Sequence, residues 1–95
     1  MTISYARVRT EKASEYLVSF SKAWLRSVPD LQFNDRLATI RFPFASCELN
    51  AGDGFLEITL TAKSKEYAEL LEDVVADRLD GFARDETLKY QWTLQ

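Results

Sequence analysis

The chain has 95 residues, of which 46% are hydrophobic and 28% are charged, with a formal net charge of −3. This balance is typical of a folded globular protein, and the length fits one domain spanning residues 1–95. The excess of acidic residues argues against a dedicated nucleic-acid binder and against a protein that binds anionic membranes.

Two residue types that carry much of protein chemistry are scarce. Cys47 is the only cysteine, so no intramolecular disulfide can form, and the chain has no histidine. Because histidine is the commonest general base and zinc ligand, we predict no catalytic residues, no cofactor and no metal site. The N-terminal residues show no signal peptide, and no apolar run is long enough to span a bilayer. We therefore expect a cytoplasmic protein.

The first predicted elements are a strand and a helix. Residues 4–9 alternate between polar and apolar side chains, as in a half-buried strand. Thr10 suits the N-cap of a helix over residues 11–27, whose apolar stripe faces a core, and Pro29 is expected to end that helix. Residues 31–33 then form a short strand.

A hairpin is predicted next. Residues 43–46 form a four-residue loop between two alternating strands. In this register Ile40 faces Leu49 on one side of the sheet and Arg41 faces Glu48 on the other. Apolar side chains are thus paired on one face and opposite charges on the other.

The following turn is signalled by Asp53-Gly54, since glycine tolerates the positive φ that a tight hairpin needs. It leads into a strand over residues 55–62, with Leu49 opposite Ile58.

The second helix is predicted over residues 65–83, with Ser64 as its N-cap. Its buried stripe is expected to run through Leu71 and Val75 to Phe82. Residues 88–94 alternate cleanly and predict a last strand.

This order, β-α-β-β-β-β-α-β, predicts an α+β fold in two layers. A mainly antiparallel sheet carries both helices on one face, and the opposite face is polar and open to water. The open face is expected to carry Arg7, Arg9, Thr39, Arg41, Glu48, Asn50, Glu57, Thr59, Thr61, Lys89, Gln91 and Thr93.

Three segments resemble the family called domain of unknown function 2218, and the resemblance extends nearly end to end. The first is residues 71–75 (LEDVV), continuing through Leu79 and Phe82 to the strand that contains Trp92. The others are residues 42–49 (FPFASCEL) and residues 6–8 (ARV), which lead into Tyr16-Leu17. The resemblance implies a small bacterial protein without an assigned activity, of the kind solved in structural genomics, with a link to siderophore and iron-uptake flavoproteins.

The resemblance also implies histidines in both helices. This chain has Ser21, Lys22 and Trp24 where they would stand in the first helix, and Arg78 near the place in the second. The absence of histidine puts in doubt any metal- or ligand-binding role that those residues have elsewhere in the family.

Arg7, Arg9 and Arg41 are the candidate surface for an anion or an acidic partner, because arginine offers several donors to carboxylate or phosphate. The simpler interpretation is that they are isolated surface residues. Cys47 is interpreted as a buried, inert thiol, and the Glu48–Glu57 pair as ion-pairing surface groups rather than an acid–base pair.

Two functions remain open at this point. The favoured hypothesis is a non-enzymatic accessory or protein-binding module that uses the open face, either for an unknown protein partner or for self-association. The alternative is a small-molecule-handling domain or enzyme with a pocket between sheet and helices, lined by Trp24, Phe44 and Tyr90.

Overall fold

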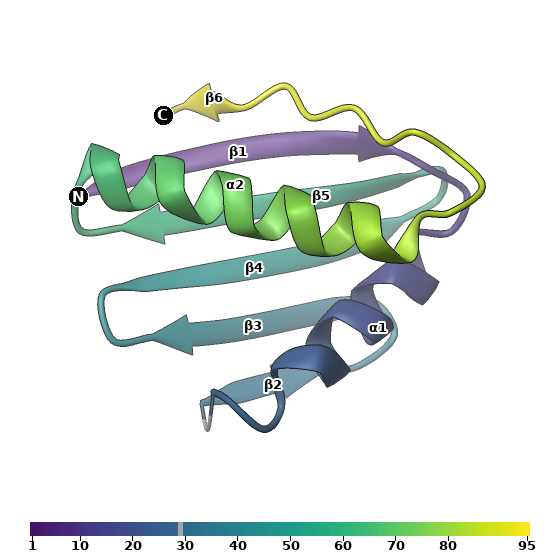
Figure 1. The fold of residues 1–95 in the computed structure, drawn as a ribbon, viewed down its shortest axis with the longest axis horizontal. Helices are drawn as coiled ribbons and strands as arrows, with labels where there is room; N and C mark the ends of the chain where they lie inside the picture. Colours follow the sequence, from purple (N-terminus) through teal and green to yellow (C-terminus); the bar gives the residue numbers. More distant parts are fainter. Residues whose placement is uncertain (29) are drawn as a thin grey trace.

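The computed structural model describes residues 1–28 and 30–95, and these form six strands and two helices (Figure 1). The elements are β1 (Thr2–Arg9), α1 (Ala13–Trp24), β2 (Leu31–Phe33), β3 (Leu37–Phe42), β4 (Ala45–Gly52), β5 (Phe55–Ala62), α2 (Lys65–Phe82) and β6 (Thr93–Leu94). The predicted α+β fold and its order of elements are confirmed.

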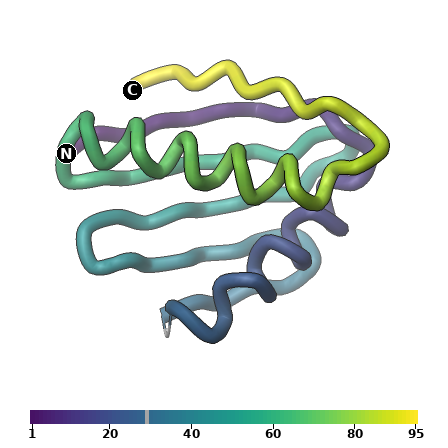
Figure 2. Tube along the Cα trace, viewed as in Figure 1, coloured from purple at the N-terminus to yellow at the C-terminus, as the bar shows by residue number. Residues whose placement is uncertain are grey.

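The sheet has the strand order β2-β3-β4-β5-β1-β6, and every neighbouring pair is antiparallel. Strand β1 therefore lies between β5 and β6, whereas β2, the next strand along the chain, lies at the opposite edge of the sheet. Both helices cover the same face: α2 runs along β1 and β5, while α1 crosses β2, β3 and β4 (Figures 1 and 2). The predicted placement of both helices on one face is confirmed.

The core lies between the sheet and the two helices. Alternate residues of the four long strands point toward the helices and are buried, as the polar–apolar alternation predicts. Helix α1 contributes Leu17 and Phe20, and α2 contributes Val75 and Leu79. These four side chains are at most 1% exposed, so the space between the layers is filled by apolar groups.

Helix α1 spans Ala13–Trp24 and is therefore shorter at both ends than the predicted residues 11–27. Thr10 is not its N-cap residue. Lys12 holds that position without a side-chain cap, and the Thr10 hydroxyl instead accepts a hydrogen bond from the Lys12 backbone N–H at 3.1 Å. Pro29, expected to end the helix, lies outside the described residues.

The hairpin between β3 and β4 has a register two residues away from the predicted one. Residues 43–44 make a two-residue turn, so Arg41 faces Ser46, and Glu48 faces Thr39. The predicted Arg41–Glu48 pair is therefore wrong. Neither Pro43 nor Phe44 has the positive φ that a glycine-containing hairpin turn uses, so no turn signal in the sequence marks this register. A shift of two residues keeps each side chain on its predicted face.

The hairpin between β4 and β5 agrees with its prediction. Leu49 lies opposite Ile58, and Gly54 in the turn has a φ of 84°. That backbone conformation strongly favours glycine, which is why the sequence signal was decisive here.

Helix α2 begins as predicted, with the Ser64 hydroxyl accepting a hydrogen bond from the Tyr67 N–H at 3.3 Å. Its buried stripe ends earlier than expected. Leu79 is fully buried, but Phe82 is 38% exposed because the helix ends there, beyond the edge of the core. The prediction that Phe82 is buried is wrong.

The last strand is much shorter than the predicted residues 88–94. Only Thr93–Leu94 pair with β1, opposite Tyr5 and Ser4. Residues 87–92 run beside β1 without joining the ladder (Figure 1).

Cys47 is fully buried, as predicted, and burial raises the pKa of its thiol to about 12. We expect native Cys47 to resist labelling by a thiol reagent at neutral pH, and Cys47→Ser to cost about 1–3 kcal/mol of stability because a hydroxyl would lie unpaired in the core. Labelling kinetics and urea unfolding check both statements. Labelling as fast as that of the unfolded chain would contradict them.

Candidate anion-binding site

The face of the sheet away from the helices is polar and solvent-accessible. Side chains from β1, β5, β4 and β3 alternate onto it, as the sequence predicted. The aromatic rings of Tyr5 and Phe55, which the sequence reasoning did not place there, share the face by the same alternation.

The structure brings together two of the three predicted arginines and leaves the third apart. Arg7 and Arg9 lie on β1, whereas Arg41 lies on β3, with β4 and β5 between them. Three strand spacings amount to roughly 14 Å, so Arg41 is not part of one cluster with the other two. It forms an ion pair with Asp30 instead, with Nη1 and Oδ1 3.3 Å apart.

Lys89 takes the place that the sequence reasoning gave to Arg41. Arg7, Arg9, Thr87, Lys89 and Gln91 line a hollow of about 530 Å³ between β1 and the C-terminal segment. All three cationic side chains are exposed. Within residues 1–28 and 30–95, the ion pairs are Lys12–Asp85, Arg36–Asp53 and Arg41–Asp30, so these three cations have no carboxylate within 4.0 Å.

The Arg7 guanidinium is held by an aromatic ring. Its central carbon lies 4.0 Å from the centre of the Phe55 ring, a cation–π contact. Phe55 in turn lies directly over Gly52, where an added Cβ would come within 2.1 Å of the ring. Gly52 therefore allows the ring to lie flat on the sheet and support Arg7.

The carboxylate nearest to Arg7 in the sheet is engaged elsewhere. Glu57 lies opposite Arg7 in the ladder, yet its side chain accepts a hydrogen bond from the Tyr5 hydroxyl. The hydrogen bond to Glu57 raises the pKa of Tyr5, and burial raises it further. Glu57 is thus bonded to Tyr5 and, among the described residues, forms no ion pair with Arg7.

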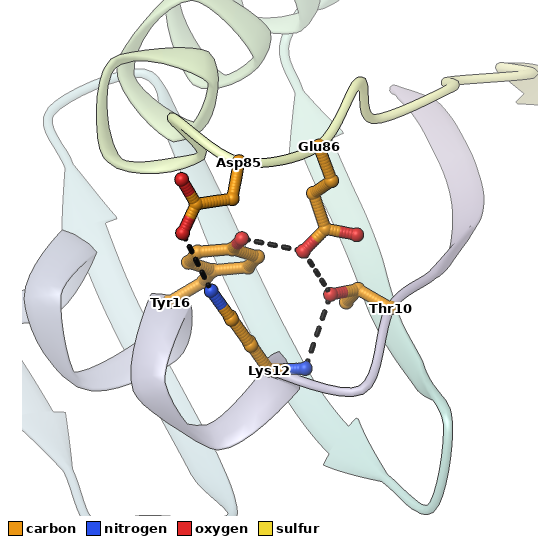
Figure 3. A network of polar contacts seen from close by, with 5 residues as sticks. All are labelled: Thr10, Lys12, Tyr16, Asp85 and Glu86. Atoms are coloured by element: carbon orange, nitrogen blue, oxygen red, sulfur yellow. Dashed lines mark hydrogen bonds and ion pairs between the residues drawn. The ribbon is translucent and has the colours of Figure 1, made fainter.

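A second network fixes the start of the C-terminal segment (Figure 3). Glu86 accepts hydrogen bonds from the hydroxyls of Tyr16, at 2.5 Å, and Thr10, at 2.8 Å. The adjacent Asp85 forms an ion pair with Lys12 at 3.4 Å. These contacts join the segment to the start of α1 and so hold Thr87 and Lys89 beside β1. No motif in the sequence signals the network, because its members are some 70 residues apart.

The three residues proposed to line a pocket have different neighbours. Trp24 packs against Phe42 with ring centres 5.3 Å apart, and the central carbon of the Arg78 guanidinium lies 4.7 Å from the centre of the Trp24 ring. Phe44 stacks on Tyr67 at the surface, with centres 5.1 Å apart. Tyr90 stacks on Trp92, and its hydroxyl donates to Asp80 at 3.1 Å. Trp24 and Tyr90 pack against the core, whereas Phe44 is 52% exposed.

Two further properties bear on function. In the described part of the chain, no group of three or more Cys, Asp and Glu residues is arranged to hold a metal ion. Neither α1 nor α2, the helices of residues 1–28 and 30–95, is long and apolar enough to cross a membrane.

The fold and site define a two-layer α+β protein with an open polar sheet face and a basic hollow at one edge. Residues 5–93 match the model of a family described as "Uncharacterized protein conserved in bacteria (DUF2218)", so the chain belongs to that family. This confirms the resemblance seen in the sequence.

A solved structure from Pseudomonas aeruginosa, the NMR structure of PA4090, is similar to this chain. The two share 28% sequence identity with a TM-score of 0.83, over 98% of this chain and 96% of the other. No curated protein matches the sequence. The comparisons thus establish family and fold, and neither the family description nor the similar structure names an activity.

Proposed function

We propose that this protein is a non-enzymatic cytoplasmic binding module that recognises an acidic protein surface through Arg7, Arg9 and Lys89. The observation that carries the proposal is the convergence of three cations without ion-pair partners on one hollow. Arginine and lysine in such an arrangement bind carboxylates with charge-assisted hydrogen bonds. The filled layer between sheet and helices supports binding over catalysis.

The net charge of −3 favours a protein partner over nucleic acid or an anionic membrane. The molecule as a whole repels an extended polyanion, whereas a local basic patch attracts a partner of matching size. We further propose that the partner acts in siderophore-dependent iron uptake, as the family resemblance implies. Self-association is the other form of the proposal, with the acidic surface supplied by a second copy.

The test uses a synthetic hexaglutamate peptide as the probe, followed by NMR chemical shifts of the backbone amides. We expect shifts confined to residues around Arg7, Arg9 and Lys89, with an affinity that falls as salt rises. The double variant Arg7→Glu/Arg9→Glu should weaken binding by about tenfold or more, because two charge-assisted contacts become repulsive.

The matched control is Lys63→Glu/Lys65→Glu, which changes the net charge equally but lies at the start of α2. If both double variants lose affinity to the same extent, only the overall charge matters and the site is refuted. Sedimentation at several protein concentrations separates self-association from binding to another protein.

A further inference from the structure

The segment of residues 88–92 has the side-chain pattern of a strand without the hydrogen bonds of one. Leu88 is buried, and Tyr90 and Trp92 pack against the core, whereas Lys89 and Gln91 are exposed. This alternation is what a strand beside β1 would show. The segment nevertheless stays outside the ladder, which ends at Thr93.

The register of β6 shows which residues would meet if the ladder continued. Tyr5 pairs with Thr93, so an unbroken antiparallel ladder places Arg7 opposite Gln91 and Arg9 opposite Lys89. Two like charges would then face each other directly, which destabilises a strand pair. The positive charge of Arg7 lies on the same face, two residues away.

The backbone of β1 is ready for this pairing. The Ile3 carbonyl accepts a hydrogen bond from the Gln95 N–H on the β6 side, and the Thr10 N–H donates to Gly54 on the β5 side. By alternation, the N–H and C=O groups of Arg7 and Arg9 point toward residues 88–92. Among the backbone hydrogen bonds of the described residues, none joins Arg7 or Arg9 to residues 88–92.

The segment is also held close by both of its ends. Upstream, Glu86 is bonded to Tyr16 and Thr10; downstream, Thr93–Leu94 already pair with β1. The Tyr90 hydroxyl donates to Asp80 on α2 at 3.1 Å. A segment tethered in this way loses little conformational freedom when it pairs, so local charge can decide its state.

We infer that residues 88–92 are a strand held open by repulsion between Lys89 and the arginines of β1, and that a carboxylate ligand in the hollow closes it. Closure extends β6 from Thr93–Leu94 back to Leu88. The identity of the ligand rests on the proposed function, whereas the repulsion that keeps residues 88–92 unpaired does not. We call this charge-controlled pairing of residues 88–92 with β1 the latch. Ligand binding would thus complete the hydrogen-bond ladder between β1 and the C-terminal segment.

The decisive variant is Lys89→Glu, which places a carboxylate opposite Arg9 without any ligand. We expect hydrogen exchange at the Arg7, Arg9 and Gln91 amides to slow by about tenfold or more, as several new backbone hydrogen bonds form. The control variant Lys63→Glu has the same charge change at a distant site and should leave these amides unchanged. In the wild-type protein, saturating hexaglutamate should slow the same three amides.

The outcomes separate the two proposals. If Lys89→Glu exchanges as fast as Lys63→Glu at these amides, the latch is refuted, whether or not the peptide binds. If the peptide fails to bind while Lys89→Glu slows exchange, the latch is supported and the proposed function is refuted. If the peptide binds without slowing these amides, ligand-driven closure is refuted and the binding function stands.

Discussion

Phe20→Ala is expected to lower the free energy of unfolding by about 3–5 kcal/mol, the largest effect of any single change considered for this protein. Phe20 lies on the inner face of α1, is 1% exposed, and is the largest of the fully buried side chains. Removing its ring opens a cavity between helix and sheet that the rigid strands cannot fill. Because a domain of this size has only about 5–15 kcal/mol of stability, much of it would be lost.

Urea unfolding measures this effect, and the chain offers a matched control. Phe44→Ala is the same chemical change at a ring that is 52% exposed in the β3–β4 turn. It removes only the stack on Tyr67, so we expect a cost below about 1 kcal/mol. Equal losses for the two variants would mean that α1 does not pack on the sheet as described.

The local elements could be predicted because their signals are local. The β4–β5 hairpin follows from Gly54, whose positive φ permits few other residues, and the start of α2 follows from the Ser64 cap. The β3–β4 turn lacks such a constraint. With Pro43 and Phe44 at its centre, alternation gave the correct faces, but the register was wrong by two residues.

The candidate site could be predicted only in part because it depends on strand order. Alternation placed Arg7, Arg9 and Lys89 on the open face, but it cannot show that β1 lies between β5 and β6. That order brings Lys89 to the arginines and takes Arg41 away from them. Repulsion between the like charges of Arg9 and Lys89 also explains why the predicted final strand is mostly unpaired.

The Glu86 network is the second feature with a large expected effect on stability. Glu86→Ala leaves the hydroxyls of Tyr16 and Thr10 without their carboxylate acceptor, and the loss is costly because both residues are buried. We expect a loss of about 2–3 kcal/mol. Two hydrogen bonds to a fully desolvated carboxylate would contribute more, but Glu86 is partly exposed and solvent weakens both bonds. Asp85→Ala is the control, because its exposed ion pair with Lys12 should contribute less than about 1 kcal/mol.

The same network predicts how stability depends on pH. Hydrogen bonds from Tyr16 and then Thr10 lower the pKa of Glu86, so its contribution is complete above the ordinary carboxyl pKa of about 4.3. It is lost as the pH falls through the lower, folded-state value. Burial, followed by the bond to Glu86, raises the pKa of Tyr16 to about 12. The Tyr16 contribution is therefore complete below about pH 10 and is lost between about pH 10 and 12.

Unfolding midpoints of the wild-type protein and Glu86→Gln, measured from neutral to strongly acidic pH, test the acid limb. The variant cannot ionise at this position, so its deficit should be constant near neutrality and should shrink once the wild-type carboxylate becomes protonated. Tyr16→Phe tests the alkaline limb, because it removes the hydroxyl that would otherwise ionise. A Glu86→Gln deficit that persists unchanged into strong acid would show that the charge on Glu86 does not hold the C-terminal segment beside β1.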